Sequence, residues 1–178
     1  MKDKKIFSLV LICMLIVSII FSGTDVSAAR KAGLRVTYKG KTVTLYKNPR
    51  RDSHKNTVSL RTVQKAWGRG RSKKMTGCTT YTWKTKKTKI EISDNSNPGR
   101  VSGSIIDIKD KNGSLAGIKV GMTKAKALKK LKKTFGAKHV KMQKALNGES
   151  FIRIDNLGAI NSFRIKSGKI TSLYYFCS

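Results

Sequence analysis

Lysine and arginine side chains offer the clearest binding chemistry in this sequence. The 178-residue sequence has 39 Lys or Arg against 9 Asp or Glu, which gives a formal net charge of +30. Because lysine outnumbers arginine in the densest clusters, the pattern favours diffuse attraction to an anionic polymer over bidentate recognition of one group. Each cluster taken singly would also suit a solvated surface. The candidate polyanion-binding residues are Arg69, Arg71, Lys73, Lys74, Lys84, Lys86, Lys87, Lys89, Lys124, Lys126, Lys129, Lys130, Lys132 and Lys133.

Two cysteines, Cys78 and Cys177, are candidates for a disulfide. Such a bond would close a loop of about 100 residues and would contribute about 4.7 kcal/mol on the chain-entropy estimate. The alternative is that they are two unrelated small apolar residues. Together with His54 and His139 they lack the paired spacing of a zinc motif, so we expect no metal site.

The remaining reactive side chains predict no enzyme and no cofactor. The chain has no nucleophile elbow, phosphate-binding loop or dinucleotide fingerprint. The segment Gly68–Arg71 resembles a phosphate cradle superficially, but it is more typical of a helix end followed by a turn. No motif pairs two carboxylates for general acid and base catalysis. The acids that follow the N-terminal segment are Asp52, Glu91, Asp94, Asp107, Asp110, Glu149 and Asp155.

Residues 1–28 are predicted to be a secretory signal peptide. Three lysines precede an apolar run over 6–21, and small residues allow cleavage after Ala28 or Ala29. An uncleaved membrane anchor is the alternative, although the run is shorter than the roughly 20 residues that a bilayer needs. Cleavage would remove three lysines and two aspartates, so nearly all of the positive charge belongs to the mature chain. We therefore expect a secreted, cell-wall-associated protein with no transmembrane segment in its mature form.

The elements that would position the cations form an internal repeat. Leu60, Val63 and Trp67 are matched 68 residues later by apolar residues of a second helix, and a glycine follows each helix. Alternating segments predict three strands after each helix, at 79–85, 89–93 and 101–109, and at 150–155, 160–165 and 170–176. The predicted fold class is α+β: two tandem helix-plus-three-strand repeats, with the helices packed on one face of an antiparallel sheet. The predicted units are a segment with a β-hairpin at 29–56, a first repeat at 57–110 and a second repeat at 111–178.

One stretch of the second repeat resembles a known family. The run Gly117–Thr123, followed by Leu128, Leu131 and the pair Phe135-Gly136, is similar to the opening of β-lactamase-inhibitor-protein-like domains and of SmpA/OmlA (BamE-type) proteins. The resemblance implies a helix followed by a three- or four-stranded antiparallel sheet, present in tandem in the inhibitors. This chain departs from the family in lacking a proline after the helix and in lacking the Gly-Met-Thr opening in its first copy.

The sequence thus predicts a secreted, strongly basic, non-enzymatic binding protein. Its expected partner is an anionic cell-wall polymer or an extracytoplasmic protein, with only non-specific binding to nucleic acid. The resemblance supplies a first alternative, an inhibitor of an extracytoplasmic enzyme such as a β-lactamase or a penicillin-binding protein. The lysine-rich second helix supplies another, a cationic membrane-active protein.

Overall fold

The computed structural model describes residues 33–47, 57–94, 98–155, 157–158 and 160–177. The predicted signal peptide, His54 and Asp52 lie outside these ranges. Two α-helices occur in the described ranges, α2 (Leu60–Trp67) and α3 (Lys124–Phe135), and a 3-10 turn, η2 (Ala137–His139), follows the second. The strands are β1 (Leu34–Tyr38), β2 (Lys41–Tyr46), β3 (Arg71–Met75), β4 (Cys78–Thr85), β5 (Thr88–Ser93), β6 (Gly103–Ile108), β7 (Ser114–Leu115), β8 (Ile118–Lys119), β9 (Val140–Lys144), β10 (Ser150–Ile154), β11 (Ile160–Lys166) and β12 (Lys169–Cys177).

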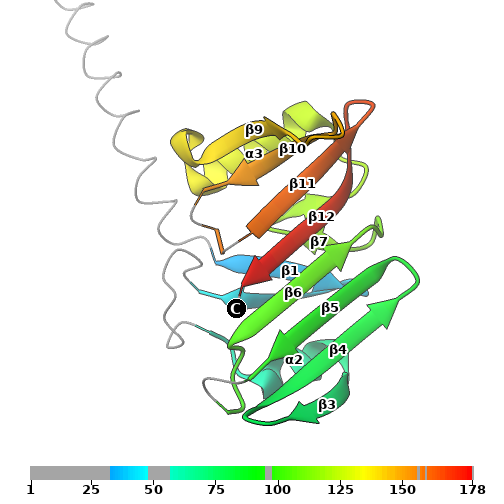
Figure 1. The fold of residues 1–178 in the computed structure, drawn as a ribbon, viewed down its shortest axis with the longest axis vertical. Coiled ribbons are helices and arrows are strands. Elements are labelled where there is room, and N and C mark those ends of the chain that lie inside the picture. The colour runs from blue at the N-terminus through cyan, green and yellow to red at the C-terminus, as the bar shows by residue number, and fades with distance from the viewer. Residues whose placement is uncertain (1–32, 48–56, 95–97, 156, 159, 178) are drawn as a thin grey trace, which may run out of the picture.

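An eight-stranded antiparallel sheet dominates the fold (Figure 1), in the order β3-β4-β5-β6-β12-β11-β10-β9. Each half of it is a four-stranded meander in which consecutive strands pair. The last strands of the two meanders, β6 and β12, pair with each other through the register Tyr175↔Ile106. The two meanders are therefore arranged alike about the centre of the sheet. In each, the last strand is central and the first strand, β3 or β9, lies at an edge.

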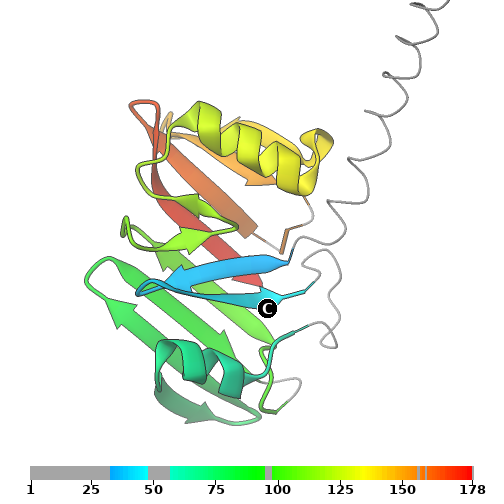
Figure 2. The ribbon, with the colours of Figure 1, turned by 180° about the vertical axis from the view of Figure 1, so that it is seen from behind.

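A second, four-stranded sheet and the two helices lie behind the large sheet (Figure 2). The order of this sheet is β2-β1-β7-β8, so the N-terminal hairpin pairs with a short hairpin from the middle of the chain. The helices α2 and α3 lie on either side of it. This layer leaves the front face of the large sheet uncovered by any described element (Figure 1).

Both helices end at the glycines that the sequence predicts, and each begins after a side chain that caps it. The Ser59 side chain accepts a hydrogen bond from the Thr62 amide at 3.3 Å, and Thr123 caps α3 in the same way. Gly68 and Gly136 follow the helices with φ of 84° and 86°, a backbone conformation that other residues rarely adopt. No helix in the described ranges is long and apolar enough to cross a membrane.

Aromatic residues tie the two layers together behind the lower half of the sheet. The Trp67 and Trp83 rings meet edge to face with centroids 5.6 Å apart, and Tyr38 packs edge-on against Trp67. The indole N–H of Trp67 donates to the Lys41 carbonyl, and that of Trp83 to the Gly68 carbonyl, both at 2.9 Å. Each buried indole therefore satisfies its polar atom while it joins α2 to a different sheet.

The predicted fold class, α+β with two tandem helix-plus-three-strand repeats and helices packed on one face of the sheet, is wrong. The molecule is mostly β, each helix is followed by a four-stranded meander of the large sheet, and a second sheet shares the rear layer with the helices. The six strands predicted after the helices are all present, and the additional ones are β3 and β9 at the edges and β7 and β8 in the small sheet. Strand β3, with the sequence RSKKM, is exposed at every position, so it lacks the alternation that marks a half-buried strand.

Candidate binding surfaces

The uncovered front face of the large sheet carries a row of apolar side chains across its central strands. Ile105 of β6, Phe176 of β12 and Ile160 of β11 are direct neighbours in the strand register. Ile105 is 37% exposed and Ile160 is 53% exposed, with Phe176 half-buried between them. We call these three residues the apolar row. Side chains that alternate with them, such as Ile106 and Tyr175, are buried against the rear layer.

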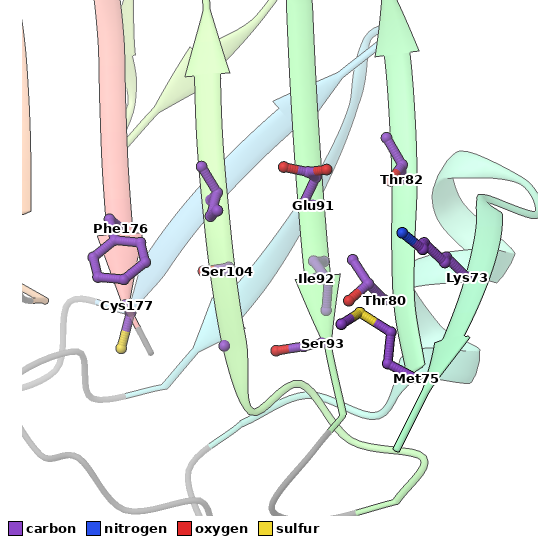
Figure 3. A pocket seen from close by; sticks show the side chains of 12 residues that line it. Lys73, Met75, Thr80, Thr82, Glu91, Ile92, Ser93, Ser104, Phe176 and Cys177 are labelled. Atoms are coloured by element: carbon purple, nitrogen blue, oxygen red, sulfur yellow. The ribbon is translucent and has the colours of Figure 1, made fainter. Parts of the chain in front are cut away.

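A pocket of about 410 Å³ opens on this face beside the apolar row (Figure 3). It is lined from β3 by Lys73 and Met75, from β4 by two threonines, from β5 by residues that include Glu91, and from β12 by Phe176. Gly103 lies opposite Ser93 in the strand register, and because it has no side chain it leaves space in the pocket. The pocket therefore offers an apolar wall, several hydroxyls, a lysine and a carboxylate to a ligand.

The acids of the open face are neutralised by neighbouring lysines. Glu91 is 2.9 Å from the Lys89 ammonium, and Asp107 is 3.2 Å from that of Lys109. The carboxylates thus sit in ion pairs with cations on their own strand or just beyond it. Together these ion pairs form a polar border beside the apolar row.

The structure places all fourteen candidate cations at the surface. Among them only Lys89 belongs to an ion pair with an acid of the described ranges. Lys84 lies directly opposite Lys89 in the β4–β5 register, where like charges repel each other.

The candidate cations do not form a single site. Six of them lie on α3, behind the β9 end of the large sheet, whereas the other eight lie near its β3 end (Figures 1 and 2). In α3 the residues Ala127, Leu131 and Phe135 are buried in the core, so its apolar stripe faces the fold and its lysines face solvent. This arrangement leaves the helix no exposed apolar face for insertion into lipid.

The candidate disulfide between Cys78 and Cys177 is not formed. Cys78 begins β4 and Cys177 ends β12, and β5 and β6 lie between these strands. Three strand spacings separate the two Cα atoms by about 14 Å or more, whereas a disulfide needs about 7 Å or less. The sequence could not show this, because the pairing of β6 with β12 sets the distance.

Three titratable groups in the described ranges have clearly shifted pKa values, and one of them is Tyr38, whose pKa is raised by burial. The other two are Tyr46 and Asp155. Burial raises the pKa of the Tyr46 phenol, whose oxygen is 3.0 Å from the Ser104 hydroxyl behind β6. Asp155 is 2.7 Å from the Lys141 ammonium, and this hydrogen bond is the main reason why the pKa of Asp155 is lowered. Both groups serve structure: Tyr46 joins the small sheet to β6, and Asp155 joins the end of β10 to β9.

Sequence reasoning missed the apolar row. Ile105 and Phe176 lie in segments that were predicted as strands, but only the pairing of β6, β12 and β11 makes them neighbours of Ile160. The described ranges contain no group of three or more His, Cys, Asp or Glu side chains that could hold a metal ion.

Comparisons with known proteins return no match: no family model, no curated protein and no solved structure is similar to this chain.

Proposed function

We propose that the protein is a secreted, non-enzymatic binding protein that its charge retains on an anionic polymer of the cell envelope. The observation that carries this proposal is the placement of exposed cations at both ends of the large sheet. With 39 basic residues and 9 acidic ones, the chain has no acids of its own for most of its cations.

The separation of the cationic ends favours a polymer over a small anion. A compact ligand could reach the lysines of α3 or those around β3, but not both groups, because the width of the large sheet lies between them. An extended polyanion can engage both ends of one molecule at once. The second contact is then effectively intramolecular and strengthens binding without any new kind of interaction.

Sedimentation with purified cell walls tests the proposal. The full-length mature protein should sediment with the walls at low salt and be released at high salt, because salt screens the attraction and reduces the free energy gained from counterion release. A variant with four α3 lysines changed to Gln (Lys126, Lys129, Lys132 and Lys133) should be released at lower salt than the parent. No retention at low salt would overturn the proposal.

A second candidate function, inhibition of an extracytoplasmic enzyme, is favoured by the open sheet face. The apolar row is flanked by cations and by the pocket beside Phe176, a combination that resembles the apolar core and polar rim of protein interfaces. The sequence resemblance to inhibitor domains points to β-lactamases and penicillin-binding proteins as targets. An assay of both enzyme types with micromolar protein tests this candidate, and a Phe176→Asp variant should lose any inhibition that the parent shows.

A further inference from the structure

A second cavity, of about 710 Å³, lies between the small sheet and α3. Its basic lining residues come from three parts of the chain: Arg35 of β1, Lys47 just after β2, and Lys130 of α3. Thr44 and Thr134 add hydroxyl groups. We call this cavity the rear cleft; apart from Lys130, none of these residues belongs to the clusters that the sequence singles out.

The rear cleft has no acidic lining residue. The reason is visible in the sequence: no Asp or Glu occurs between Asp25 and Asp52, or between Asp110 and Glu149. These two acid-free stretches supply every residue of the lining. Arg35, Lys47 and Lys130 are also absent from the four ion pairs of the described ranges. An anion in the cleft would therefore meet no repelling carboxylate in its lining.

The backbone of the cleft is arranged around the Lys130 ammonium. The turn between β7 and β8 has positive φ at Ala116 and Gly117, and the Ala116 amide donates to the Arg35 carbonyl at 2.8 Å. A Cβ at position 117 would lie 3.1 Å from Cε and 3.3 Å from Nζ of Lys130. The absent side chain thus leaves the space in which the lysine lies across the turn, and the backbone hydrogen bond joins this turn to Arg35 of β1.

We propose that the rear cleft binds a phosphate group of a phosphodiester polymer. The proposal rests on the proposed function and names the site that would recognise the polymer. A phosphate has several oxygens that can accept from a guanidinium, an ammonium and hydroxyls together, and the Arg35, Lys130 and Thr134 side chains supply these donors. The cleft is far larger than one phosphate, so the adjoining units of the polymer have room to follow.

The test compares two triple variants of the mature protein that remove the same charge. The cleft variant is Arg35→Gln, Lys47→Gln and Lys130→Gln, and the control is Lys84→Gln, Lys86→Gln and Lys87→Gln at the β4–β5 turn. All six side chains are exposed, so both variants should fold, which circular dichroism checks. The probe is a poly(glycerol phosphate) oligomer, with binding measured by calorimetry at fixed salt.

We expect the cleft variant to bind the oligomer at least about tenfold more weakly than the control, since one hydrogen bond to a charged group contributes about that factor. In the parent, titration should shift the amide resonances of Gly117 and Thr134 before those of Lys86 and Lys87. Equal losses in both variants, with binding by the parent intact, would overturn the cleft site but leave the proposed function standing. No binding by the parent to this oligomer or to cell walls would overturn both.

A polymer with carboxylates in place of phosphates tests whether the rear cleft recognises phosphate in particular. An oligogalacturonate of matched charge should bind the parent more weakly and should respond equally to the two variants, because it would follow only the general field. A cleft-dependent affinity for the oligogalacturonate as strong as that for the phosphate oligomer would overturn the assignment to phosphate.

Discussion

The two faces of the large sheet use neighbouring residues for opposite purposes. Ile106 is fully buried against the small sheet and the helices, whereas Ile105, one residue earlier, is 37% exposed on the open face. The same alternation separates Tyr175 from Phe176 on β12. Apolar side chains on the rear face have an evident structural role, because they fill the core. Those of the open face contribute less to the core, and this difference is what makes the apolar row a candidate surface.

The largest expected effect on stability is that of a substitution on the buried rear face of the large sheet. Ile106→Thr replaces a buried ethyl group with a hydroxyl among apolar neighbours, so the free energy of unfolding should fall by about 2–4 kcal/mol. Urea unfolding followed by tryptophan fluorescence measures it, since Trp67 and Trp83 are both in the core. A loss below about 1 kcal/mol would contradict the layer arrangement described above.

An intermediate effect is expected at high pH from Tyr46, which lies between the two layers. Its pKa is raised by burial, so the folded protein keeps the phenol proton after the unfolded chain begins to lose it near pH 10. The contribution of this group to stability is therefore complete below about pH 10 and is lost as the pH rises toward the folded pKa.

Tyr46→Phe isolates that contribution from the titration of the lysines. The variant loses the hydrogen bond to Ser104 and should be less stable than the parent at pH 8 by about 1 kcal/mol. The difference should shrink above about pH 10, because only the parent has the buried phenol. A constant difference in urea unfolding from pH 8 to pH 11 would show that the phenol is not buried in solution.

The sequence predicts those parts of the molecule whose signals are local. Caps and glycines bound both helices, and alternation marks the six strands that have one buried face. Strands β3 and β9 are not predicted, because edge strands rich in lysine resemble loops. Strands β7 and β8 are not predicted either, because two residues are too few to show an alternation of apolar and polar side chains. Alternation alone also does not give the faces of the last strand, because its register with β11 shifts near Ile170 and places both Ile170 and Leu173 in the core.

The candidate sites divide in the same way. Dense lysine clusters are visible in the sequence, but their location at opposite ends of the large sheet is not. Arg35 and Lys47 are isolated cations in the sequence, and only the pairing of β1 with β7 brings the turn at Gly117 and the α3 lysine to them. The density of lysines along the chain therefore predicts that the protein attracts anions in general. The rear cleft cannot be predicted in this way, because its cations are brought together only by the fold.

The smallest expected effect on stability is that of Ile105→Thr, which tests the difference between the two faces of the large sheet most directly. The substitution is the same as at position 106, and threonine keeps the β-branched side chain that a strand favours. On the open face the new hydroxyl remains in contact with water, so the free energy of unfolding should change by no more than about 0.5 kcal/mol. Equal destabilisation by Ile105→Thr and Ile106→Thr would mean that the front face is covered in solution, for example by a second copy of the chain. Sedimentation of the parent and of both variants would detect that copy. A stable monomer that tolerates the change at 105 but not at 106 leaves the apolar row available for binding.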